Sequence, residues 1–118
     1  KELAGRTGAV IAITGAIDLV AAASKALAIR NGHPMMSKIT GTGCMLSAIT
    51  AAFVAANPGK ALEATASAVC AMGLCGELAY QKVKAQGAGT GTLRVALIDA
   101  MSNLTGEQLE GGAKIEGC

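Results

Sequence analysis

The loop Gly41-Thr42-Gly43-Cys44 places two glycines, a hydroxyl group and a thiol at the start of a long apolar run. Glycine lets the backbone adopt positive φ and approach a ligand closely. If a helix begins here, its first N–H groups have no acceptor within the helix, and the helix dipole favours negative charge at this end. The loop is therefore suited to hold an anion such as a phosphoryl group.

Cys44 is the candidate for chemistry in this loop. A helix N-terminus favours the thiolate form of a cysteine, which could attack as a nucleophile or accept a proton from an attacking hydroxyl group. The alternatives are a simple turn for the glycines and a core position for the thiol, beside Met45 and Leu46. No Lys-Ser/Thr pair follows the glycines and no third glycine completes a dinucleotide fingerprint, which excludes a P-loop and a Rossmann loop.

Three weaker candidates lie on either side of this loop. His33 stands in a turn, Asn-Gly-His-Pro, where a structural role is expected and catalysis is the alternative. Lys38 is either an ordinary exposed lysine or a phosphate contact. A second glycine loop at 87–91, which contains Gly89, is either a nucleotide contact or a connector between helices.

Strands and helices that alternate along the chain are expected to position these residues, and this order predicts an α/β fold. Short apolar runs bounded by glycine, as in Thr7 to Gly15, are typical of strands buried on both faces of a parallel sheet. The sequence predicts a mainly parallel sheet, with strands at 7–15, 16–22 and 25–32.

Three helices are predicted after the first glycine loop. Residues 42–56 are apolar on nearly every side, which predicts a helix deep in the core. A second helix is predicted at 60–86; its Gly73 and Gly76 each cost roughly 1 kcal/mol relative to alanine, so both are expected at points of close packing. A third helix follows the second glycine loop, and the tail from Thr105 is expected to be peripheral.

Composition excludes several classes of protein. Hydrophobic residues make up 52% of the 118 residues, aromatic residues 2%, and the net charge is +2. This balance argues against nucleic-acid binding, and charged residues interrupt the apolar stretches before the ~18 residues of a membrane span. Four cysteines without metal-ligand spacing indicate buried free thiols in a reducing cytoplasm, with disulfides as the alternative. The opening segment KELAGRTG predicts the end of a helix leading into a strand, as expected within a longer chain.

The segment NGHPMMSKITGTGCMLSAITAAF, residues 31–53, resembles the signature region of the hydroxyethylthiazole kinases. The resemblance continues in VIAITGAID, in MGLCGELA and in GTGTLRVALIDAMSNLT, and so covers most of the chain in the family's order. It implies that residues 1–118 are the C-terminal portion of a single ribokinase-like kinase domain. It also implies transfer of phosphate from ATP to 4-methyl-5-(2-hydroxyethyl)thiazole, with magnesium and a homotrimer.

The resemblance assigns roles to individual residues. Cys44 corresponds to the base that helps to deprotonate the thiazole's hydroxyl group, and Gly41 to a contact with the thiazole. Nucleotide contacts are implied at Thr14, Thr42, Gly43 and Gly89. One departure concerns Ala16, where family members usually carry glutamate after the Thr-Gly pair; its loss leaves no magnesium ligand to assign in this segment.

Two alternatives remain open from the sequence. One is another ribokinase-like enzyme, a hydroxymethylpyrimidine kinase or a nicotinamide-nucleotide-hydrate dehydratase, although aspartate would then be expected in place of Cys44. The other is an inactive fragment that folds with a partner segment and serves as a binding or structural piece.

Overall fold

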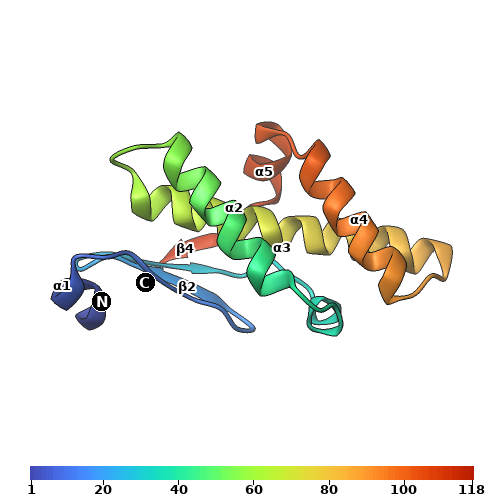
Figure 1. The fold of residues 1–118 in the computed structure, drawn as a ribbon, viewed down its shortest axis with the longest axis horizontal. Helices are drawn as coiled ribbons and strands as arrows, with labels where there is room; N and C mark the ends of the chain where they lie inside the picture. Colours follow the sequence, from blue (N-terminus) through green and yellow to red (C-terminus); the bar gives the residue numbers. More distant parts are fainter.

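One long helix organises the computed structural model, which describes all 118 residues. A four-stranded sheet packs against α3 (Ala61–Gln86), and α2 (Thr42–Ala56) and α4 (Thr90–Asn103) pack against the same helix (Figure 1). The strands are β1 (Ile11–Ile13), β2 (Asp18–Ala21), β3 (Ala26–Ile29) and β4 (Ile115–Gly117). The short helices are α1 (Glu2–Thr7), the 3-10 helix η1 (Pro34–Lys38) and α5 (Gly106–Gly112).

The sheet is antiparallel throughout, so the predicted parallel sheet is wrong. The strand order is β1-β2-β3-β4, and each neighbouring pair is antiparallel. Between β2 and β3 the Ala22 N–H donates to the Lys25 carbonyl oxygen at 2.8 Å, which closes a tight turn. Such short connections can join only antiparallel neighbours, because a parallel pair needs a crossover of a dozen or more residues.

The centre of the molecule is built from small side chains on α3. This helix carries most of the buried residues, among them Ala68, Cys70, Ala71 and Cys75. By length and composition α3 could cross a membrane, but 72% of its most apolar window is buried inside the protein, as in a core helix.

Both glycines of α3 lie at close contacts, as predicted. A Cβ at Gly73 would come within 2.7 Å of the Asn31 backbone. A Cβ at Gly76 would meet the Sδ atom of Met36. The absence of a side chain at these two positions lets residues 31–36 lie directly on the helix, so packing offsets the low helix propensity of glycine.

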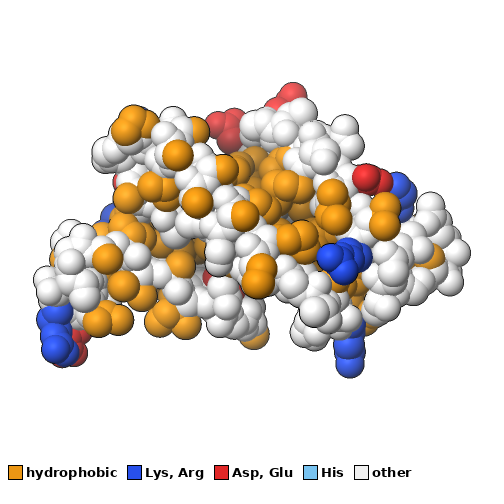
Figure 2. Space-filling model, in the orientation of Figure 1, with side chains coloured by type: hydrophobic (Ala, Val, Ile, Leu, Met, Phe, Trp, Pro, Cys, Tyr) orange, Lys and Arg blue, Asp and Glu red, His pale blue; other side chains and the backbone are white.

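The prediction that residues 42–56 form a helix is confirmed, but its expected place deep in the core is wrong. No residue of α2 is fully buried. The physical reason is that α3 covers one side of α2 and leaves its other sides open (Figure 1). Figure 2 shows apolar side chains over this face, including the space between α2 and α4, where Met45, Ile49, Leu97 and Met101 line an apolar groove of about 260 Å³.

The C-terminal tail lies at the surface, as predicted, but it forms regular structure. Residues 106–112 form α5, and 115–117 add the strand β4 to the edge of β3. The Lys114 N–H donates to the side-chain oxygen of the buried Asn31 at 2.8 Å. At the other end of the chain the predicted helix end is confirmed, because α1 stops at Gly8, which adopts a left-handed conformation with φ +71°.

Candidate phosphoryl-transfer site

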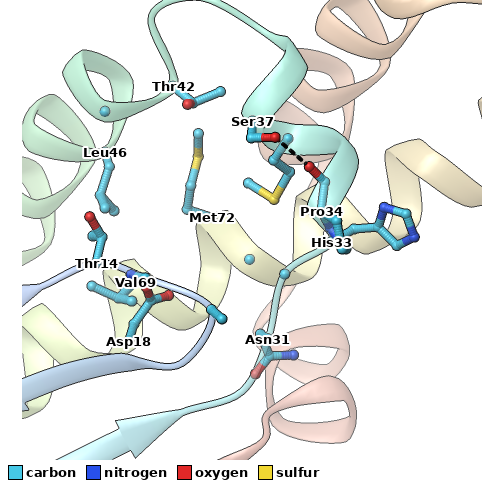
Figure 3. A pocket seen from close by; sticks show the side chains of 16 residues that line it. Thr14, Asp18, Asn31, His33, Pro34, Ser37, Thr42, Leu46, Val69 and Met72 are labelled. Atoms are coloured by element: carbon cyan, nitrogen blue, oxygen red, sulfur yellow. Dashed lines mark hydrogen bonds between the residues drawn. The ribbon is translucent and has the colours of Figure 1, made fainter.

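A cavity of about 560 Å³ opens where three segments meet on α3 (Figure 3). The turn between β1 and β2 lines one side of the cavity with residues 14–16 and Asp18, and residues 31–34, 36 and 37 line another. The start of α2 contributes Thr42, Gly43 and Leu46. Val69, Met72 and Gly73 of α3 complete the lining.

The N-terminus of α2 reaches this cavity without a side-chain cap. Gly41 is the N-cap residue and adopts φ +94°, a conformation that side chains other than glycine's rarely tolerate. No side chain accepts a hydrogen bond from the first turn of the helix. Because the amides of a first turn also lack acceptors within the helix, Thr42 and Gly43 present hydrogen-bond donors and the positive end of the helix dipole at the cavity.

Cys44 follows Gly43 directly and is exposed. It is a free thiol beside the cavity, but it is not among the residues that line it. The exposed position excludes the core role that was the alternative for this cysteine. The prediction that the four thiols are buried is wrong for Cys44 and Cys118, which are exposed, and confirmed for Cys70 and Cys75. The thiol is therefore accessible to a substrate that reaches the start of α2.

Asp18 is the one carboxylate in the cavity lining. Its Oδ1 atom accepts a hydrogen bond from the Gly15 N–H at 2.9 Å, which closes the turn between β1 and β2. Burial raises the pKa of Asp18 above its ordinary value of 3.8, and the hydrogen bond from Gly15 opposes this shift without cancelling it. Thr14 lies on the same turn, so this turn gives the cavity a hydroxyl group and a carboxyl group.

His33 has a structural role, in agreement with the expectation from sequence. Its Nδ1 atom accepts a hydrogen bond from the Met35 N–H at 3.1 Å and so caps η1. The imidazole ring stacks on Tyr80 of α3, and Figure 3 shows the ring directed away from the cavity. His33 thus holds the segment in place, and its ring is not available for proton transfer inside the cavity.

The structure brings some of the predicted site residues together and leaves others apart. Thr14, Thr42 and Gly43 line one cavity. Gly41 and Cys44 flank it on the glycine loop. Gly89 is the N-cap residue of α4 and lies outside the cavity lining, so its contact with a nucleotide stays a prediction.

Sequence reasoning missed the part played by Asn31 and Glu77. Asn31 belongs to the predicted turn Asn-Gly-His-Pro, yet it is buried, and its side chain is hydrogen-bonded to that of Glu77. The signal available in the sequence was the segment Gly73-Leu-Cys-Gly76-Glu77, where two glycines on one helix face adjoin an acidic residue. Small residues of this kind admit a backbone segment, whose N–H groups then need an acceptor.

The residues of this chain do not form a site for magnesium. No three of its His, Cys, Asp and Glu side chains converge where a metal ion could be held. The Oδ1 atom of Asp18, the carboxylate of the cavity, already accepts the Gly15 N–H.

Comparison with known proteins decides the family. The model of the hydroxyethylthiazole kinase family matches residues 1–107. The chain belongs to this family. A hydroxyethylthiazole kinase from Clostridium acetobutylicum is 55% identical over 116 residues, which cover 98% of this chain and 42% of that protein. A hydroxyethylthiazole kinase from Zea mays is 41% identical, over 98% of this chain and 40% of that protein.

A solved structure shares the fold of this family member. The hydroxyethylthiazole kinase protein from Pyrococcus horikoshii OT3 superposes with a TM-score of 0.87 at 34% sequence identity. The match covers 98% of this chain and 43% of that one. The chain thus spans about two-fifths of the length of the relatives that it matches.

Proposed function

We propose that the polypeptide containing this chain is a hydroxyethylthiazole kinase with a ribokinase-like fold. It transfers the γ-phosphoryl group of ATP to the primary hydroxyl group of 4-methyl-5-(2-hydroxyethyl)thiazole, a step of thiamine salvage. The observation that carries this proposal is the uncapped start of α2, whose Thr42 and Gly43 line the cavity in a member of this family. Magnesium as cofactor, a homotrimer and a cytoplasmic location belong to the same proposal.

The chemistry assigned to this chain needs an anion site and a base. Phosphoryl transfer depends mainly on positioning and on stabilising charge over the transferring group. The amides of Thr42 and Gly43 donate hydrogen bonds to that group, and the dipole of α2 favours its charge. The hydroxyl oxygen attacks the γ-phosphorus, its proton passes to the Sγ atom of Cys44 in thiolate form, and the bond to the ADP oxygen breaks.

The remaining roles concern binding. Gly41, which has no side chain to keep a ligand from its backbone, contacts the thiazole. The hydroxyl group of Thr14 faces the phosphates from the turn between β1 and β2, and Gly89 contacts the nucleotide from the start of α4. These assignments extend the geometry of the cavity and of the two helix N-termini.

An assay across two classes of alcohol tests this function. The natural polypeptide that contains this chain is incubated with ATP and either the thiazole alcohol or hydroxymethylpyrimidine, and ADP formation is followed. The expected result is transfer to the thiazole alcohol with a kcat/KM far above that for the pyrimidine. Preference for the pyrimidine would favour the other ribokinase-like kinases, and no transfer to either would favour an inactive piece. The intact mass of the natural polypeptide shows which form was assayed.

A further inference from the structure

The turn Asn31-Gly32 forms one wall of the cavity and is held from α3 by Glu77. The Gly32 N–H donates to Oε1 of Glu77 at 2.9 Å, and this is the hydrogen bond that this amide makes. The same oxygen accepts a longer hydrogen bond, 3.4 Å, from Nδ2 of Asn31. A single carboxylate oxygen on α3 thus binds two consecutive residues of the wall.

Close packing fixes the position of this turn on α3. Asn31 is 4% exposed, and a Cβ at Gly73 would collide with its backbone, so the two segments are in direct contact. Oδ1 of Asn31 accepts from the Cys70 thiol at 3.2 Å and from the Lys114 N–H, while Nδ2 donates to the Gly112 carbonyl oxygen at 2.8 Å. The turn is therefore held from both the central helix and the C-terminal segment.

The wall continues from this turn towards the glycine loop. Gly32 precedes His33, which caps η1, and η1 leads to Gly41 and the start of α2. A shift of Gly32 would therefore move the cavity lining from residue 31 to residue 37. Gly32 adopts φ +127°, a conformation that few side chains tolerate but that glycine adopts readily, so the chain can turn here without strain.

We propose that Glu77 is a positioning residue for the substrate cavity. Its carboxylate does not line the cavity; it acts through Gly32 and Asn31, by holding the wall opposite the first turn of α2. The kinetic part of this inference rests on the function proposed above. The structural part, protection of the Gly32 amide by Glu77, does not.

The ion pair of Glu77 is separate from this role. Nζ of Lys114 lies 3.1 Å from Oε1 of Glu77, but the Lys114 side chain is 56% exposed. The Glu77 side chain is only 18% exposed, but the solvated lysine end keeps the contribution of the pair to stability small. Lys114→Ala is therefore a suitable control, because it removes the ion pair and leaves the acceptor for Gly32 unchanged.

The test compares Glu77→Ala with Glu77→Gln in the natural polypeptide. Two quantities are measured: hydrogen exchange of the Gly32 amide, and KM and kcat for the thiazole alcohol. Glu77→Ala should speed exchange of this amide about tenfold, because a half-buried N–H loses its acceptor, and should raise KM more than it lowers kcat. In Glu77→Gln the exchange rate of the Gly32 amide and the kinetic constants should lie close to those of the wild type, since the glutamine side-chain oxygen still accepts the Gly32 N–H. Two control variants should match the wild type in amide exchange and kinetics. One is Lys114→Ala, and the other is Glu63→Ala, which removes an exposed carboxylate on the same helix.

Two results would overturn this role: unchanged exchange at Gly32 in Glu77→Ala, or equal behaviour of the alanine and glutamine variants. Should Glu77→Ala fail to fold, Glu77→Asp replaces it. The aspartate side chain is one methylene shorter, so hydrogen exchange of the Gly32 amide should again be faster than in the wild type. An unchanged exchange rate in Glu77→Asp would count against the proposal. If the wild type does not phosphorylate the thiazole alcohol, the proposed function fails, and the exchange data alone still decide whether Glu77 holds the turn.

Discussion

The imidazole ring of His33 stacks on the phenol ring of Tyr80, with ring centroids 3.6 Å apart and ring planes inclined by 17°. The contact joins the segment that lines the cavity to α3, some residues beyond Glu77. Nδ1 of the same ring accepts a hydrogen bond from the Met35 N–H. His33 therefore fixes η1 through its ring face and through one ring nitrogen.

Replacing Tyr80 tests this anchor. Tyr80→Leu should lower the free energy of unfolding by about 1 kcal/mol, because a stacked aromatic pair adds roughly that much beyond the area it buries. Tyr80→Phe keeps the stacked ring and, since the phenol oxygen makes no hydrogen bond in this structure, should unfold like the wild type. Denaturant unfolding of both variants measures the difference. Equal destabilisation by leucine and phenylalanine would show that stacking does not hold η1.

Cys44→Ala should lower kcat by about 10²–10⁴-fold with little change in the KM for the thiazole, because a general base contributes about that much to the rate. Cys44→Asp should keep substantial activity, since a carboxylate can also accept the proton. Cys118→Ala is the matched control, because Cys118 is the other exposed thiol. Steady-state kinetics decide the matter: undiminished turnover in Cys44→Ala would remove the base assignment, and complete loss in a folded Cys44→Asp would indicate a covalent or steric role.

Much of the helical structure could be predicted from the sequence. The strand direction in the sheet and the exposure of α2 could not. The apolar run after the glycine loop placed residues 42–56 correctly, and the close contacts at Gly73 and Gly76 followed from their cost within a helix. The sheet was misjudged because apolar runs such as Ile11–Ile13 look alike in parallel and antiparallel sheets. The short gaps between strands were the better evidence, since no crossover helix fits in them.

The candidate site was predictable where local pattern determines it. Gly41 with positive φ and an uncapped helix start at Thr42 follow from residue types alone. The wall made by Asn31 and Gly32 depends on contacts 45 and 46 residues distant in sequence, through Glu77, and on the C-terminal Gly112 and Lys114. Burial of α2 depends on what covers its open sides, which its own apolar pattern does not specify.

Asp18→Asn should stabilise the protein at neutral pH. Burial raises the pKa of Asp18 above 3.8, so the folded state holds this proton more tightly than the unfolded state does. The free energy of unfolding of the wild type therefore falls as the pH rises from 3.8 through the raised pKa. The asparagine oxygen can still accept the Gly15 N–H, while the charge is gone. The melting temperature of Asp18→Asn should exceed that of the wild type at neutral pH, and the two should converge in acid. A lower melting temperature of the variant at neutral pH would contradict this explanation.

The four thiols should fall into two classes of reactivity. Cys44 and Cys118 are exposed, whereas Cys70 and Cys75 are buried. Burial raises the pKa of Cys75 from 9.0 to about 11, so it remains a protonated thiol in the native state at neutral pH. Alkylation followed by peptide mapping should modify the exposed pair rapidly and the buried pair only on unfolding. Rapid native labelling of Cys75 would show that α3 opens locally.

The same thiol gives stability a dependence on alkaline pH. An unfolded cysteine loses its proton near pH 9.0, whereas the folded Cys75 keeps its proton up to about 11. The free energy of unfolding should therefore decrease as the pH rises through this interval, and the decrease due to this residue should be absent in Cys75→Ala.

The most direct test of phosphoryl binding at the start of α2 is a titration with a non-hydrolysable ATP analogue, followed by backbone amide chemical shifts. In the isotope-labelled natural polypeptide, the amides of Thr42 and Gly43 should show large shifts together with that of Thr14, while those of α5 should not. Saturable binding of the analogue that leaves the Thr42 and Gly43 amides unchanged would contradict the proposed site.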